Sequence, residues 1–237
     1  MSDTKYTELV SFMKRNLEHL SYSSGSGENL TFPTFDLMPF DYLEFAEQEL
    51  DKPSLAAKIN CIAHLKRAVE CQLDTLLGVL GASKVATNFP KKLEFASASG
   101  AISSRSLAKI NRIRNRVEHE YAAPDTGELE AYYDIASGFI HTIEGYIFML
   151  SNHWEMDWIC EEVGCSSAFR AAICTTPASV KFNLKEGESD RELLFDASSM
   201  AEYCQGLKAY FLLCRADGLL SVEYVLAKLE GKSLYEA

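Results

Sequence analysis

The chain lacks the run of about eighteen apolar residues that a membrane-spanning helix requires. Residues 1–5 also lack the charged-then-apolar pattern of a secretory leader. We therefore expect a cytoplasmic protein with no membrane association. Seven cysteines occur, but no two are spaced as C-x-x-C, and no cysteine, histidine or carboxylate cluster has the spacing of metal ligands. These absences predict no metal site, no cofactor, and thiols that are reduced and mostly buried.

Positive charge is scarce, because 34 acidic residues outnumber 23 basic ones and give a net charge of −11. This balance argues against broad, non-specific binding to nucleic acid. One stretch is the exception, since no acidic residue lies between Ala101 and Val117. The basic residues in it are Arg105, Lys109, Arg112, Arg114 and Arg116. Such a run is either a solvated helix face or a strip that binds phosphate.

Apolar periodicity and turn signals divide the 237 residues into three parts. The middle part, residues 39–154, has the periodicity of helices, with a proline- and glycine-containing stretch over residues 83–103 that is expected to be a loop or a loop with one short helix. The helices expected there cover residues 40–51, 53–81, 104–121 and 125–153. Asp125 and Glu128 resemble a capping box at the start of the last of these helices. Four helices with short or medium links predict an antiparallel bundle.

The two flanking parts have different textures. Residues 1–38 are expected to form a short helix over 4–20, followed by a flexible connector of serine and glycine over 21–29. Residues 155–237 contain a strand–turn–strand pattern over 180–196 and two further helical segments, one of them opened by Ser199 and Glu202. The fold class predicted is thus mainly α, an antiparallel helical bundle followed by a small α+β C-terminal region to which the sequence assigns no role.

The most informative stretch is residues 114–121, with the sequence RNRVEHEY. It places Arg114, Asn115, His119 and Tyr121 within about two turns of a predicted helix. A histidine can move protons between the 2′-hydroxyl of RNA and the leaving oxygen, while a guanidinium holds the charged phosphate. Because RNA carries its own nucleophile, this pair is a minimal set of groups for cleaving RNA without a metal.

Helical geometry gives this stretch a further property. With about 100° per residue, an apolar stripe forms from Leu107, Ile110, Ile113, Val117 and Tyr121. Arg114 lies about 40° from the centre of that stripe, and about 140° from His119. One chain therefore does not bring both groups to one phosphate on a regular helix. A two-fold dimer would, if Arg114 of one chain approached His119 of the other.

Simpler interpretations of the same residues remain open. Arg114 could pair with Glu118 four residues on, as a surface ion pair of little consequence. His119 could be a helix-end histidine favoured by the carbonyl dipole. The four other histidines, at positions 19, 64, 141 and 153, are expected to be structural.

The pattern Arg114-Asn115-x-x-x-His119-x-Tyr121 resembles the R-x4-H-x-Y signature of HEPN domains, in particular the HepT-type toxin ribonucleases. The resemblance covers residues 40–154 in helical order and is specific only at the motif. It implies a helical bundle that dimerises so that both motifs line one cleft, and metal-independent endoribonuclease activity. It also implies an antitoxin partner, or a nucleotidyltransferase that modifies Tyr121.

These observations together predict an HEPN-type endoribonuclease of a toxin–antitoxin or antiviral defence module, acting on RNA as a homodimer. Arg114 would stabilise charge on phosphorus, His119 would act as general acid or base, Asn115 would orient it, and Tyr121 would be auxiliary or regulatory. RNA would be bound by Arg105, Lys109, Arg112 and Arg116. The main alternative is a non-catalytic HEPN-like module that binds nucleotides or a protein partner. A third is a purely structural helical interaction protein.

Overall fold

Five strands form an antiparallel sheet in the computed structural model, which describes residues 2–27, 30–102, 112, 115–116, 125–216 and 218–232. Neighbours in the sheet follow chain order: β1 (Leu20–Ser26), β2 (Glu155–Cys160), β3 (Ala168–Thr175), β4 (Ala178–Glu186) and β5 (Ser189–Asp196). β1 pairs with β2, with Leu20 opposite Cys160. Because the helical region lies between β1 and β2 in sequence, the sheet joins the N-terminal segment to the C-terminal part.

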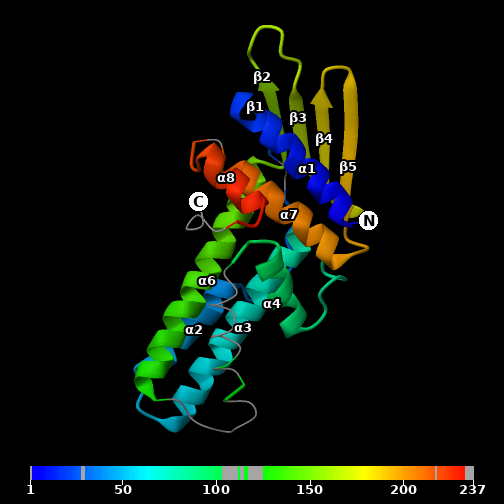
Figure 1. Cartoon of the computed structure of the whole chain (residues 1–237). Coiled ribbons are helices and arrows are strands. Elements are labelled where there is room, and N and C mark those ends of the chain that lie inside the picture. Colours follow the sequence, from blue (N-terminus) through cyan, green and yellow to red (C-terminus); the bar gives the residue numbers. More distant parts are fainter. Residues whose placement is uncertain are drawn as a thin grey trace.

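Helices cover one face of this sheet. α1 (Ser2–Asn16), which is followed by the 3-10 turn η1 (Leu17–His19), and α7 (Met200–Cys214) pack on it, and α8 (Val222–Leu229) lies beside them (Figure 1). The strands alternate accordingly, since Val180, Phe182 and Leu184 are buried whereas Lys181 and Asn183 are not. The opposite face carries ion pairs between strands, at Asp157–Arg170 and Lys181–Glu192.

A helical arm projects away from the sheet (Figure 1). It consists of α2 (Pro39–Leu50), α3 (Leu55–Val79) and α6 (Thr126–Asn152), which pack against one another. α4 (Phe89–Ala98) contacts both α3 and α7. Ser54 caps α3 and Asn88 caps α4, because each side chain accepts a hydrogen bond from a backbone N–H in the first turn.

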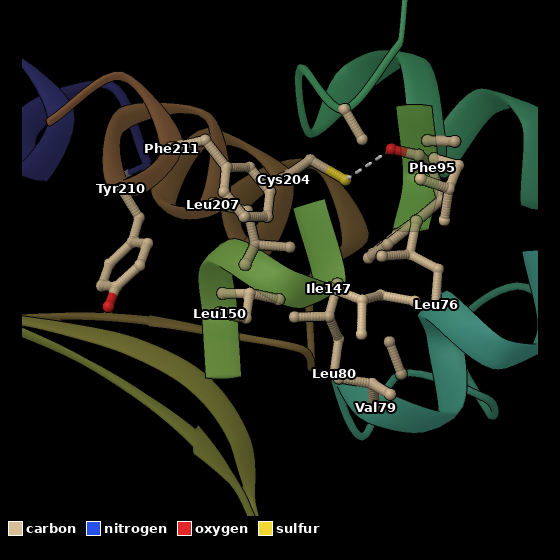
Figure 2. Packing of buried hydrophobic residues seen from close by; sticks show 14 of the residues in the cluster. Leu76, Val79, Leu80, Phe95, Ile147, Leu150, Cys204, Leu207, Tyr210 and Phe211 are labelled. Carbon is tan, nitrogen blue, oxygen red and sulfur yellow. Dashed lines mark hydrogen bonds between the residues drawn. The ribbon is translucent and has the colours of Figure 1, made fainter. Parts of the chain in front are cut away.

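The arm and the sheet layer share one hydrophobic core. At their junction the C-terminal end of α3 meets α4, α6 and α7. Figure 2 shows one residue from each of these helices there: Leu76, Phe95, Ile147 and Leu207. Polar groups at the junction are also paired. The Tyr203 hydroxyl, for example, donates to the Leu80 carbonyl at 2.8 Å. The α7 helix is therefore held by both halves of the molecule.

The end of α3 shows why the junction is so close. Gly81 adopts φ +65° and closes a Schellman motif, in which the Ala82 N–H donates to the Leu77 carbonyl at 2.7 Å. A Cβ on Gly81 would lie 2.6 Å from the carbonyl oxygen of Thr175 in β3. Glycine is thus required both for the left-handed backbone and for the contact between arm and sheet.

The predicted fold class is wrong. The described chain is not a mainly helical bundle followed by a small C-terminal region, because a five-stranded sheet recruits the N-terminal segment. The predicted flexible connector over residues 21–29 instead forms most of β1. Strands β2 and β3 were also absent from the prediction. Their pairing partners lie in other segments, so local periodicity did not reveal them.

Local signals predicted the other elements more accurately. The predicted helices over residues 40–51, 53–81 and 125–153 are confirmed as α2, α3 and α6. The capping box at Asp125 and Glu128 is present, and so is the hairpin expected over 180–196. The helix expected over 104–121 lies mostly outside the described residues.

The prediction for the cysteines is wrong for one pair. Cys160 and Cys165 form a disulfide that closes the turn between β2 and β3. The remaining five cysteines are free, and Cys61, Cys204 and Cys214 are buried. Burial raises the pKa of the Cys204 thiol to about 12 and that of the Cys61 thiol to about 11. These buried thiols are therefore protonated packing groups rather than nucleophiles.

Candidate functional site

The motif and the basic strip before it are described at three positions. Arg112, Asn115 and Arg116 are helical; the first two are exposed and Arg116 is half-buried. Asn115 and Arg116 lie three and four residues after Arg112, so each of them lies on the same side of the helix as Arg112. The other predicted site residues lie outside the described part of the chain: Arg105, Lys109, Arg114, His119 and Tyr121.

Arg116 is tied to the start of α6. Its Nη1 lies 2.5 Å from Oε1 of Glu128, with both side chains about two-fifths exposed. The other oxygen of the same carboxylate accepts the Asp125 N–H at 3.3 Å, and the Glu128 N–H donates to the Asp125 carboxylate at 2.8 Å. Glu128 therefore both caps α6 and holds an arginine of the motif. The sequence pattern indicated only the capping role.

This ion pair changes what Arg116 can contribute to RNA binding. To contact a phosphate, the Arg116 guanidinium must either bind the phosphate and the Glu128 carboxylate at once or release the carboxylate. Arg112 is exposed and is not held by such a carboxylate within the described residues. Of the two described arginines in the basic strip, Arg112 is thus the one more directly available to an anion.

The other histidines have separate surroundings. His19 pairs with Glu162 at 3.0 Å, His141 lies 3.6 Å from Glu144, and His153 hydrogen-bonds Tyr22 at 3.3 Å. Each of these three histidines thus contacts one side chain of the described structure, and the structural role expected for them stays a prediction.

His64 is the unusual member of the set. It packs against the rings of Tyr42 and Phe45, at centroid distances of 6.4 and 5.5 Å. Its Nδ1 atom is buried and has no hydrogen-bond partner within the described residues. Burial lowers the pKa of His64, and the nearby Arg67 lowers it further. A neutral imidazole between aromatic rings suits packing between α2 and α3.

Two hollows flank the segment that leads into α2, which we call the strap (residues 30–38). An apolar groove of about 520 Å³ lies between the strap, the first turn of α2, α3 and α6. A more polar hollow of about 560 Å³ lies on the other side, and Arg67, Glu70 and Asp74 are among its lining residues. One residue of the groove was visible in the sequence as an aromatic side chain outside any predicted element, namely Phe32 of the strap.

Metal ligands and membrane spans are both absent from the part of the chain that the structure describes. No group of three or more histidine, cysteine, aspartate or glutamate side chains is arranged there to hold a metal ion. No helix in the same residues is long and apolar enough to span a bilayer.

No protein-family model, curated protein or solved structure matches the chain. The likeness to HEPN domains therefore rests on the sequence of the motif alone.

Proposed function

We propose that the chain is a metal-independent endoribonuclease of the HEPN type, acting in the cytoplasm in a toxin–antitoxin or antiviral defence module. The observation that carries this proposal is the spacing of Arg114, Asn115, His119 and Tyr121 in the sequence. The pair of a proton carrier and an anion holder is what RNA cleavage by internal attack needs.

The chemistry follows from these groups. The ribose 2′-oxygen attacks phosphorus, the bond from phosphorus to the 5′-oxygen breaks, and a 2′,3′-cyclic phosphate forms. His119 removes the 2′-hydroxyl proton or supplies one to the leaving 5′-oxygen. Arg114 stabilises the charge that builds on the phosphoryl oxygens, and Asn115 orients the histidine or the substrate. Tyr121 is an auxiliary group, and a candidate for modification by a partner nucleotidyltransferase.

Two features of the described residues support the proposal. Arg112 and Asn115 are exposed, so this segment presents a basic and an amide side chain to solvent. The Arg116–Glu128 ion pair places the guanidinium of Arg116 beside the first turn of α6. We further propose a homodimer, because the angular separation of about 140° between Arg114 and His119 favours a site shared between two chains.

The decisive experiment incubates the purified protein with mixed RNAs in the presence of EDTA. Cleavage is expected to persist and to leave 2′,3′-cyclic phosphate ends. The variants Arg114→Ala and His119→Ala should each lose activity by about 10²-fold or more. Arg191→Ala and His19→Ala remove an exposed arginine and an exposed histidine elsewhere, and should cleave like the wild type. Full activity in the Arg114→Ala, His119→Ala double variant would falsify the assignment.

A non-catalytic binding module is the second candidate, and the exposed aromatic groove beside the strap favours it. Under that alternative, no RNA would be cleaved by the wild-type protein at any EDTA concentration. The two candidates also differ in their sensitive residues, because a binding module would depend on the groove and not on His119.

A further inference from the structure

Exposed apolar side chains are concentrated on the strap and next to it. Of the eleven large apolar side chains exposed among the described residues, six lie on the strap, the first turn of α2 and one turn of α6. They are Phe32, Phe35, Leu37, Met38, Phe40 and Phe148. Phe148 is 72% exposed. Phe32, Met38, Phe40 and Phe148 line the apolar groove, whereas Phe35 and Leu37 line the polar hollow across the strap. Exposed apolar side chains gathered around a groove are typical of an interaction surface and cost solubility if left uncovered.

The floor and walls of the groove are mostly, but not wholly, apolar. Gln72 and Thr75, its buried polar residues, already donate hydrogen bonds within the fold. The Gln72 amide donates to the Ile140 carbonyl at 3.4 Å, and the Thr75 hydroxyl donates to the Cys71 carbonyl at 2.9 Å. Neither side chain therefore depends on a ligand for a partner. Apolar side chains suit such a floor better than a polar small molecule.

The groove is also preformed. The ring of Pro33 in the strap packs closely on α3 at Gly78. A Cβ at Gly78 would lie only 2.5 Å from Cγ of this ring, so the close contact requires glycine. The Leu37 carbonyl accepts a hydrogen bond from the Cys71 thiol at 3.7 Å, at the other end of the strap. A groove with fixed walls loses little conformational entropy when it is filled.

The charges around the groove indicate what kind of partner would fill it. Glu144 is the one charged residue among the described residues that line the groove, and it lies one turn before Phe148 on α6. The hollow across the strap adds Asp36 and Glu70, whereas its Asp74 is paired with Lys92 at 2.5 Å and Arg67 is the one cation in its described lining. A second copy of this chain that docked through the same surface would bring a second Glu144 carboxylate to the contact. A cationic segment is instead attracted by the surface and by the protein as a whole.

We infer that the groove between the strap and α6 docks a basic amphipathic helix of a partner protein. Its apolar side chains would fill the groove beside Phe148, and lysine or arginine side chains on its flank would lie near Glu144. The walls favour a helix, since they are formed by α3, α6 and the first turn of α2 rather than by a free strand edge. This inference goes beyond ribonuclease activity and does not depend on it.

The test uses the full-length protein and two labelled helical peptides of about five turns. Both carry leucine at positions i, i+3, i+4 and i+7, and their polar positions are lysine in one peptide and glutamate in the other. Binding is followed by fluorescence anisotropy. We expect the leucine–lysine peptide to bind the wild-type protein at least about tenfold more tightly than the leucine–glutamate peptide.

Matched variants separate the groove from general attraction to an acidic protein. Phe148→Gln should weaken the binding of the leucine–lysine peptide about tenfold or more. Leu219→Gln removes another highly exposed apolar side chain and should leave this affinity unchanged. Glu144→Lys should reduce the preference for lysine, and Glu188→Lys in the β4–β5 turn should change it less. Phe148 and Leu219 are both largely exposed, so neither change disturbs the core.

Two results would overturn the inference. One is equal loss of peptide binding in Phe148→Gln and Leu219→Gln, or no loss in either, which would place binding outside the groove. The other comes from sedimentation, if the wild-type protein dimerises and Phe148→Gln does not. The groove would then be covered by a second copy of the chain.

Discussion

Glu128 accepts the guanidinium of Arg116 with one carboxylate oxygen and the N-cap N–H of Asp125 with the other. A single side chain thereby couples Arg116 to the first turn of α6. The negative charge also stands at a helix N-terminus, where the macrodipole favours it. Any phosphate that approaches Arg116 has to compete with this carboxylate.

That competition gives a first prediction. Glu128→Gln keeps a side-chain oxygen that can accept the Asp125 N–H but removes the charge opposite Arg116. Stability should fall by no more than about 1 kcal/mol, because the ion pair is partly exposed. RNA affinity should rise, since the carboxylate no longer competes with phosphate for Arg116. Urea unfolding and anisotropy with a single-stranded RNA measure the two quantities.

Its controls lie close in the chain. Glu130→Gln removes an exposed carboxylate two residues on and should leave RNA affinity nearer to that of the wild type. Arg116→Ala should weaken RNA binding. If Glu128→Gln and Arg116→Ala weakened binding equally, the ion pair would act by positioning the motif, and Arg116 would not contact RNA.

The packing of α7 on the sheet gives a second prediction. A Cβ on Gly206 would lie 2.6 Å from Cβ of Phe195 and 3.2 Å from Cβ of Val180. Gly206→Ala should therefore destabilise the fold by about 1–3 kcal/mol through overpacking. Gly138→Ala is the matched control in α6, because nothing lies within 4 Å of its Cβ position. That change should stabilise by about 0.5–1 kcal/mol, as alanine is the better helix former. Equal effects in thermal unfolding would contradict the close contact.

Local patterns in the sequence predicted local structure. The apolar spacing of α3, its end at Gly81, and the capping box of α6 are all encoded within a few residues. The strands β1 to β3 depend on contacts between distant segments. β1 has the composition SYSSGS after Leu20, which suits a linker, and it is a strand because β2 supplies its hydrogen-bond partners. β3 is rich in alanine, and its alternation is hidden because Ala171, Ala172 and Ile173 are all buried.

The candidate site divides in the same way. The chemistry proposed for Arg114 and His119 is a prediction from their types and spacing, and both residues lie outside the described part of the chain. The partner of Arg116 does not follow from helical spacing, because Glu128 lies twelve residues later in the chain, in α6. The groove beside the strap likewise needs Phe148 of α6 to meet a segment more than a hundred residues earlier, which only the packing of the arm produces.

The third prediction concerns the proposed dimer. If the catalytic pair is shared across two chains, mixing Arg114→Ala with His119→Ala protein should restore activity to about a quarter of the wild-type value. Half of the dimers would be mixed, and one of the two sites in each would be intact. The mixture is assayed after subunit exchange, alongside each variant alone. A mixture that stays inactive would show that each chain has its own independent site. Sedimentation of the protein as a pure monomer would contradict the proposed dimer.

The fourth prediction is that RNA binding is strongly salt-dependent although the protein is acidic overall. The net charge of −11 means that attraction to phosphate has to be local, and the basic strip around Arg112 is the densest source of positive charge in the sequence. The variant Arg112→Ala, Arg116→Ala should flatten the log–log salt dependence by about 0.7 for each phosphate that the protein no longer neutralises. The control Arg15→Ala, Arg191→Ala removes two exposed arginines that pair with Glu186 and Glu8 instead. An unchanged slope in the first variant, or an equal change in both, would mean that RNA docks elsewhere.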